Sequence, residues 1–358
     1  MPEGRAVAIR PPDERRRGAS MKLTDVLREA GSRGDIVGRV REFERRYGGE
    51  TRGGRDERTT HYRDFLKEYY DLATDLYEFG WGRSFHFSGR RRGESFAAAL
   101  VRSEHYLARR LALEPGMVVA DLGCGIGGPM QEIARFSGAK IVGINSSGYQ
   151  IRRAEQLSQV SGLGHLLEFL ECDFIDIDAP DASYDAVYSI QSICCSPDVA
   201  GVYAEAFRVL KPGGCFAAYE YSLTDRFDEG NAEHRRIKAD LEYGGGVPDI
   251  PRQGEIDAAL RRAGFELLEA RDLTAEGLFD IPWYEPLTGS RLSFTGFRRS
   301  AVGRKLTNAF LWLLEWLRVV PRGTARVAAL LNLSADAHAE AGEHDIFTPE
   351  YFVLARKP

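Results

Sequence analysis

The feature that most constrains this chain is a series of alternating strand and helix patterns that begins at Met117. Short apolar runs alternate with segments whose apolar residues recur every three or four positions. The expected strands span 117–122, 140–145, 167–173, 184–190, 215–221 and 265–273, and the helices among them span 129–136, 149–160, 199–210 and 254–263. Because strands joined through helices pair in parallel, this order predicts an α/β fold. Its parallel sheet is covered on both faces and is complete near residue 273.

A glycine-rich turn follows the first expected strand and reads Asp121-Leu-Gly123-Cys124-Gly125-Ile-Gly127-Gly128. Glycines let backbone amides approach a ligand closely, and the start of the next helix adds positive potential. The spacing fits both G-x-G-x-x-G and G-x-G-x-G. The glycines alone therefore allow either NAD or S-adenosylmethionine.

Polar residues at the strand ends favour one of these cofactors. Asp121 lies just before the turn, where a carboxylate suits an ammonium group, such as a methionine amine, better than a pyrophosphate. The second strand ends at Asn145, where an NAD site has an acidic residue for the ribose. Asp173 and Phe174 offer an acceptor for an adenine amine and a ring for its face, and Gln191 follows the fourth strand. This set indicates the Rossmann-like fold of class I methyltransferases.

S-adenosylmethionine is therefore the expected cofactor. The residues expected to bind it are Asp121, Gly123, Cys124, Gly125, Asn145, Gln150, Asp173, Phe174 and Gln191.

Composition excludes several other classes of protein. The net charge of −5 argues against nucleic-acid binding, and no apolar run reaches the roughly 20 residues that a membrane span needs. The amino terminus has no apolar stretch typical of a secretory signal. Five cysteines form no C-x-x-C pair and seven histidines show no metal-ligand spacing, so we expect reduced thiols, an intracellular location and no metal site.

Aromatic residues are concentrated before the first strand. Ten of the 38 Phe, Tyr and Trp residues lie within residues 62–96. The segment 69–87 reads YYDLATDLYEFGWGRSFHF, and the turn continues to Pro129 as DLGCGIGGP. Together with 231–234, 247–250, 283–286 and 346–349, these segments resemble the motifs of the sterol C24-methyltransferase family. The resemblance runs from about Val40 to the last residue.

This resemblance implies an S-adenosylmethionine-dependent C-methyltransferase that alkylates the side-chain double bond of a sterol or related triterpenoid through a carbocation. Such a reaction needs a dry pocket whose aromatic faces and carboxylates stabilise positive charge, and one base that takes a proton. The residues expected to shape the cation site are Tyr77, Glu78, Trp81, Phe87 and Glu220, and the candidates for proton removal are His86 and Glu104. Each aromatic residue, taken singly, is equally consistent with ordinary core packing.

The chain departs from the family pattern after the fourth strand. Members typically read Ile-Glu-Ala-Thr-Cys-His-Ala-Pro, whereas residues 190–197 read Ile-Gln-Ser-Ile-Cys-Cys-Ser-Pro, which puts Gln191 in place of Glu and Cys195 in place of His. Two alternatives therefore stay open. The chain is a methyltransferase acting on another isoprenoid or a prenylated phenol, or it is a non-catalytic homologue that binds lipid or cofactor.

Four regions are expected along the chain. They are a disordered and partly helical region 1–60, with its helix over 23–47, an aromatic substrate-pocket segment 61–114, the cofactor-binding domain 115–275, and a C-terminal α+β extension 276–358. A helix over 306–319 carries Trp312 and Trp316 one turn apart, which fits either packing on the sheet or peripheral membrane contact. The expected location is cytoplasmic or peripheral to a membrane, that of the endoplasmic reticulum in a eukaryote. The sequence is compatible with a homo-oligomer and does not determine the number of subunits.

Overall fold

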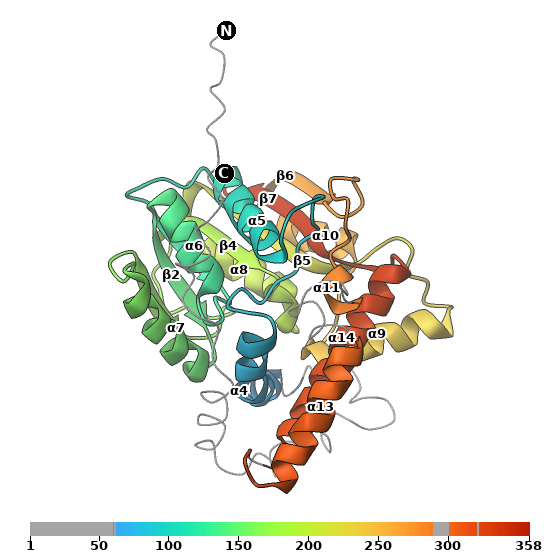
Figure 1. Cartoon of the computed structure of the whole chain (residues 1–358). Coiled ribbons are helices and arrows are strands. Elements are labelled where there is room, and N and C mark those ends of the chain that lie inside the picture. The colour runs from blue at the N-terminus through green and yellow to red at the C-terminus, as the bar shows by residue number, and fades with distance from the viewer. Residues whose placement is uncertain (1–59, 61, 289–300, 321) are drawn as a thin grey trace.

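A computed structural model describes residues 60, 62–288, 301–320 and 322–358 (Figure 1). The expected helix over 23–47, and all of region 1–60 except its last residue, lie outside the described residues.

A seven-stranded sheet forms the centre of the molecule, in the order β3-β2-β1-β4-β5-β7-β6. Neighbouring strands from β3 to β5 pair in parallel, which confirms the predicted α/β arrangement. The strands are β1 Val118–Leu122, β2 Lys140–Asn145, β3 Leu167–Glu171, β4 Tyr184–Ile190, β5 Leu210–Leu223, β6 Glu266–Asp272 and β7 Phe347–Arg356.

Strand β7 differs from the expectation. It lies between β5 and β6 and pairs antiparallel with both, so the prediction that the sheet is complete near residue 273 is wrong. Nine of its ten residues are buried, because both faces of an inserted strand are covered. Such a strand shows no alternation of apolar and polar residues, and its position in the sheet does not follow from its position in the chain.

Helices cover both faces of the sheet. Successive residues of β1, Val119 and Ala120, belong to two different apolar clusters, which therefore lie on opposite faces. One cluster includes residues of α5 and α6, and the other includes residues of α4, α8, α9 and α10. The helices are α4 Tyr62–Gly80, α5 Phe96–Arg110, α6 Gly128–Ser137, α7 Gly148–Ser161, α8 Val199–Val209, α9 Ala232–Gly245 and α10 Gln253–Arg262.

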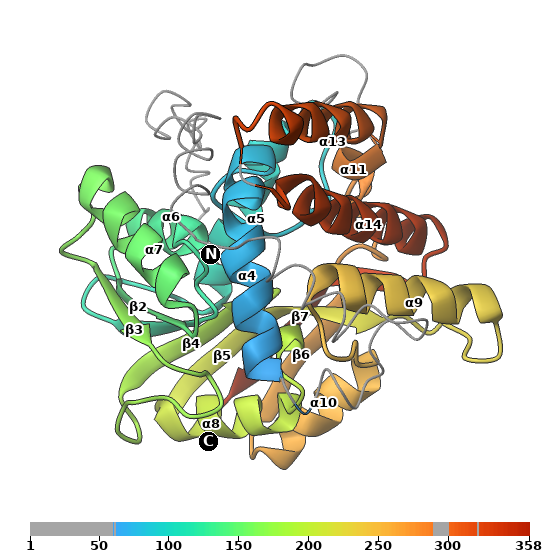
Figure 2. The same ribbon diagram turned by 90° about the horizontal axis from the view of Figure 1, so that it is seen from below.

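Two further long helices follow in the C-terminal region, with the short α11 (Glu285–Thr288) before them. These are α13 (Ala301–Trp316) and α14 (Thr324–Glu343), and Figure 2 shows them on the side of the molecule where α4 and α9 lie. Helix α14 packs against α9, α13 and α4. None of the helices in the described ranges is long and apolar enough to cross a membrane.

The position of β7 leads to a test of the fold. Val353 is fully buried and pairs with residues on both neighbouring strands. We expect Val353→Asp to destabilise the protein by on the order of 4 kcal/mol or more, because the carboxylate would be buried without a partner. Urea denaturation followed by circular dichroism measures the change. Leu268→Asp on β6, where the side chain is 46% exposed, is the control and should cost far less; equal losses would contradict the buried position of β7.

Candidate functional site

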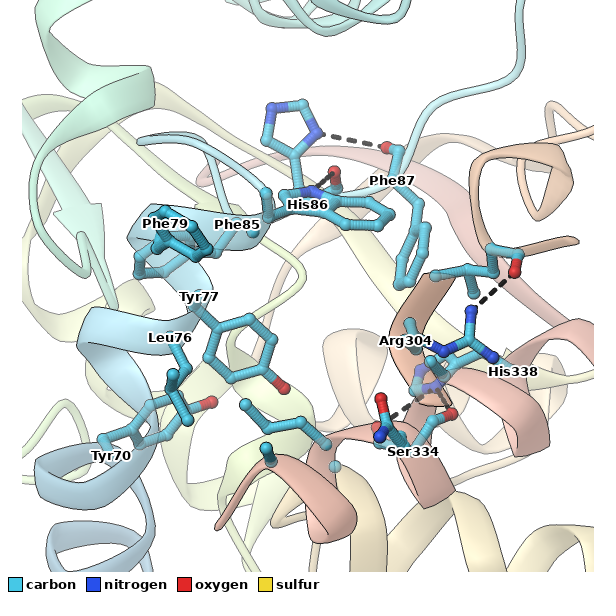
Figure 3. Close-up of a pocket in the computed structure, with 18 of the residues that line it drawn as sticks. Tyr70, Leu76, Tyr77, Phe79, Phe85, His86, Phe87, Arg304, Ser334 and His338 are labelled. Carbon is cyan, nitrogen blue, oxygen red and sulfur yellow. Dashed lines mark hydrogen bonds between the residues drawn. The ribbon is translucent and has the colours of Figure 1, made fainter. Parts of the chain in front are cut away.

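An apolar pocket lies between α4, the segment that follows it, the ends of β4 and β5, and the C-terminal helices (Figure 3). Its wall is rich in aromatic side chains, most of them from the segment singled out by the sequence. These are Tyr70, Tyr77, Phe79, Trp81, Phe85, Phe87 and Tyr221. The aromatic surplus before the first strand therefore forms one side of a cavity.

Contacts between rings hold this wall in place. The ring of Trp81 lies edge-on against Phe87 at 5.1 Å between centroids, and Phe87 lies edge-on against Trp283 at the same distance. The indole Nε1 of Trp81 also donates a hydrogen bond of 3.2 Å to the backbone oxygen of His86. The ring centroids of Tyr77 and Phe85 are 5.5 Å apart. The aromatic faces are thus fixed by packing before any ligand binds.

Gln191 joins this wall to the sheet. Its Oε1 accepts a hydrogen bond of 2.9 Å from the Phe87 backbone N–H, and its Nε2 donates one of 3.1 Å to the Phe87 backbone oxygen. The residue also has a positive φ of 55°, an unusual conformation for a side chain other than glycine. Of glutamine and the glutamate typical of the family, only glutamine supplies the acceptor and the donor together at neutral pH. The glutamine that departs from the family pattern therefore has a defined structural partner.

Cys195, the second departure, also lies in the pocket wall. Its Sγ is 3.3 Å from the hydroxyl of Tyr70, and Cys194 lies beside it.

The two carboxylates expected near the cation, Glu78 and Glu220, do not line the pocket. Glu78 receives two hydrogen bonds of 2.8 and 2.9 Å from Arg153, and it is not among the residues that line the pocket. Glu220 accepts a hydrogen bond of 3.1 Å from Tyr203, and burial raises its pKa to about 8. Buried carboxylates need such partners, which turns them away from an apolar cavity.

His86 and Glu104, expected to remove a proton, are bound to one another. The Nε2 of His86 is 3.1 Å from Glu104 Oε1, and its Nδ1 is 3.1 Å from the backbone oxygen of Phe87. Ser84 donates a further hydrogen bond of 2.8 Å to Glu104. His86 lines the pocket, but both of its ring nitrogens already have oxygen neighbours, and Glu104 does not reach the cavity.

The glycine turn lies at the carboxyl end of β1. Gly123, Gly125 and Gly127 have φ values of 81°, 56° and 79°, which favour glycine. A Cβ on Gly123 would collide with the side chain of Ser192, so only glycine allows the turn to approach Ser192 this closely. The ring of Phe85 is 3.9 Å from the position of a Cβ on Gly125. The turn thus lies directly beside the aromatic wall.

Asp121 is the penultimate residue of the same strand and is almost fully buried. Its Oδ2 accepts a hydrogen bond of 3.0 Å from Tyr188. Burial raises its pKa to about 7, with the charge of Glu104 acting in the same direction and the Tyr188 hydrogen bond against it. A buried carboxylate of this kind would gain most from a cationic ligand group.

The other expected cofactor residues also gather at this edge of the sheet. Asn145 ends β2, and its side-chain amide donates a hydrogen bond of 2.8 Å to Gln150 Oε1. Asp173 follows β3, where it accepts hydrogen bonds from the Tyr62 hydroxyl and from the Ile175 backbone N–H. Phe174 is nearly buried beside Gly123, and Cys124 is buried in the turn. The glycine cradle and the buried Asp121 carboxylate fit S-adenosylmethionine, which when bound supplies a methyl group on a cationic sulfur.

The C-terminal helices contribute pocket residues that the sequence did not suggest. Arg304 and Asn308 come from α13, and Ser334 and His338 come from α14. Helix α14 was not expected, and no spacing of His338 distinguishes it from the other histidines. Trp283 contacts Phe87 and lies within a segment, 283–286, whose resemblance to the family was noted without a role.

The fold and this edge of the sheet define a class I methyltransferase. A methyltransferase domain model matches residues 120–218, and a model described as the sterol methyltransferase C-terminal region matches 294–358. The "[4+2]-Cyclase SpnF" has a TM-score of 0.61 at 22% identity, covering 82% of this chain and 95% of that one. Geranyl diphosphate methyltransferase in complex with SAM has a TM-score of 0.52 at 18% identity, covering 76% and 98%. These similarities show the fold.

Relatives of known activity show the family. Cycloartenol-C-24-methyltransferase of Arabidopsis thaliana is 46% identical over 306 residues, which is 86% of this chain and 90% of that protein. Sterol 24-C-methyltransferase of Saccharomyces cerevisiae is 40% identical over 328 residues, which is 89% of this chain and 85% of that protein. The chain belongs to the sterol C24-methyltransferase family, as its aromatic segment predicts.

The raised pKa of Asp121 gives a test of cofactor binding. An ammonium group binds the ionised carboxylate, so we expect the affinity for S-adenosylmethionine to rise as pH increases from 6 to 8, through the pKa of about 7. Asp121→Asn should weaken binding and remove this dependence, as measured by calorimetry at pH 6, 7 and 8. Asp181→Asn, at an exposed carboxylate, is the control. An Asp121→Asn variant with wild-type affinity and slope would rule out this role.

Proposed function

We propose that this chain methylates the side-chain double bond, in the C24 region, of a sterol or related triterpenoid, with S-adenosylmethionine as the methyl donor. The observation that carries the proposal is the contact between the two halves of the site. The aromatic wall of an apolar pocket meets the glycine turn through Phe85 and meets the end of β4 through Gln191. A long apolar substrate held in this pocket has its reacting end beside the methyl donor.

The chemistry needs no nucleophile from the protein, because the π electrons of the substrate form the new C–C bond. The role of the chain is to exclude water and to stabilise the carbocation. No aspartate or glutamate is among the residues that line the pocket in the described part of the chain. The faces of Tyr77, Trp81, Phe85 and Phe87 are therefore the groups that we assign to the cation, each stabilising it by about 2 kcal/mol when desolvated.

Three of the four regions expected from the sequence have distinct parts in this proposal. Residues 61–114 form the aromatic wall, 115–275 bind the cofactor, and 276–358 cover the pocket with α13 and α14 and supply β7.

Incubation with methyl-labelled S-adenosylmethionine and a panel of sterols, triterpenes and prenylated phenols tests the proposal. Label in the alkylated side chain of a sterol or triterpene supports it. Label only on a phenol oxygen or ring would favour the prenylated-phenol alternative, to which the departures at Gln191 and Cys195 point. Cofactor binding by calorimetry with no labelled product from any acceptor would indicate a non-catalytic binding protein.

Trp81 allows a direct test of the aromatic faces. Trp81→Phe and Trp81→Leu both lose the hydrogen bond to the His86 backbone oxygen, but only phenylalanine keeps a π face. We expect kcat to be about 30-fold lower in the leucine variant than in the phenylalanine variant, since about 2 kcal/mol of cation stabilisation is lost. Steady-state kinetics on the accepted sterol measures this. Equal kcat values for the two variants would show that the ring face of Trp81 does not act on the cation.

Helix α13 supports a proposal about where the substrate is collected. Leu311, on the inner side of the helix, is buried and lines the pocket. The outer side exposes large apolar residues, which in most proteins are buried. These are Leu306, Phe310, Trp312, Leu313 and Trp316, with Leu317 and Val319 directly after the helix. Exposed basic residues, Lys305, Arg318 and Arg322, lie close to them in the chain. Apolar and basic groups together fit the surface of a membrane that contains anionic lipids.

We propose that this face docks the protein peripherally on an intracellular membrane, that of the endoplasmic reticulum in a eukaryote. Co-sedimentation with phosphatidylcholine vesicles that contain phosphatidylserine should be lost in Trp312→Ser/Trp316→Ser, while activity on detergent-dispersed sterol is kept. Val160→Ser, an exposed apolar position on α7, is the control. Vesicle binding equal to wild type in the double variant would contradict docking through α13. A dimer by light scattering that the double variant abolishes would place a second copy of the chain on this face instead.

A further inference from the structure

The proposed reaction must end with the loss of a proton, and the base for this step has to lie in the pocket wall. Among the lining residues in the described part of the chain there is no carboxylate. The wall contains phenols and thiols, whose ordinary pKa values lie above 8. Burial raises the pKa of the three phenols further, and a hydrogen bond between the two thiols lowers the pKa of Cys195 and raises that of Cys194. Its guanidinium group is not a base. The remaining candidates are the two histidines of the wall, His86 and His338.

Both ring nitrogens of His86 already have an oxygen neighbour within the protein. Its two ring nitrogens lie 3.1 Å from Glu104 Oε1 and 3.1 Å from the backbone oxygen of Phe87. His338 differs at one nitrogen. Its Nδ1 lies 2.7 Å from the backbone oxygen of Ser334 (Figure 3), and its Nε2 has no hydrogen-bond partner.

The partner of Nδ1 determines the form of the ring. A carbonyl oxygen only accepts hydrogen bonds, so Nδ1 carries the proton and Nε2 carries the lone pair. The side chain is 5% exposed, and burial lowers its pKa to about 4. His338 is therefore neutral at physiological pH, with a buried acceptor atom that the protein leaves unsatisfied. A buried acceptor without a partner destabilises the folded protein, and a hydrogen bond from a ligand would remove that cost.

Burial disfavours a positive charge on His338, but the aromatic rings around it offset part of that cost. Phe87 stacks on its ring at 5.1 Å between centroids, and the rings of Tyr221, Phe347 and Trp283 lie at 5.8, 5.6 and 6.3 Å. An imidazolium formed here would be stabilised by these aromatic groups. Gln191, at the end of β4, forms two hydrogen bonds with the backbone of Phe87. The ring of Phe87 therefore lies between His338 and the end of β4.

We propose that Nε2 of His338 is the base that removes the proton from the alkylated sterol cation. The step rests on the proposed function. A C–H bond next to the cationic carbon breaks, its electron pair becomes the new C=C bond, and the proton joins Nε2 to give an imidazolium ion. That ion returns its proton to water when the product leaves. A weak base is sufficient, because a carbocation is a far stronger acid than imidazolium.

Two substitutions separate this role from simple hydrogen bonding. His338→Asn keeps a hydrogen-bond acceptor without basicity, and His338→Leu removes both. We expect both variants to bind sterol within about threefold of wild type, measured by tryptophan fluorescence. We expect kcat to fall on the order of 100-fold in both, as for loss of a general base. The product mixture should shift toward alkenes with a displaced double bond and alcohols formed by capture of water. His344→Asn, at the exposed end of the same helix, is the control and should match wild type.

The outcomes are distinguishable. Wild-type kcat and products in His338→Asn would show that the residue acts as an acceptor for a substrate hydroxyl, and the proposal would be overturned. A kcat that falls in both variants with an unchanged product mixture would indicate a structural role and would also overturn it. If the wild-type chain methylates no sterol or triterpene, that result would instead contradict the proposed function itself.

Discussion

The two hydrogen bonds between the Gln191 amide and the Phe87 backbone connect the parts of this molecule on which its site depends. On one side of the pair is the end of β4, next to the glycine turn. On the other is the aromatic wall, since Phe87 contacts Trp81, Trp283 and His338. A glutamate at 191 would keep the acceptor and lose the donor unless it were protonated. The departure from the family pattern therefore changes a structural link as well as a charge.

Much of the sheet could be predicted from the sequence, because its first five strands and their helices follow local patterns. The end of β2 at Asn145 and the glycine turn at 123–128 stand where the sequence predicts them. Strand β7 could not be placed in this way. Its partners, β5 and β6, are separated from it by α13 and α14, and burial on both faces removes the alternation that marks a strand.

The site shows the same limit. Composition located the aromatic wall, because ten rings in a short segment are a local signal. It did not show which groups face the cavity. Glu78, Glu104 and Glu220 lie within or near the correct elements, but each is turned toward Arg153, His86 or Tyr203. Those partners come from other parts of the chain, as His338 and Asn308 do, and only the folded structure brings them together.

The absence of carboxylates from the described pocket wall has a chemical consequence. A buried carboxylate beside a carbocation would stabilise it strongly, but it would also be a nucleophile that could trap the cation as an ester. Aromatic faces stabilise the cation without forming a bond to it. With the carboxylates kept behind the rings, the neutral imidazole of His338 is the group in the wall suited to end the reaction by proton removal. In this arrangement the geometry of one base, relative to the cationic carbon, determines which C–H bond breaks.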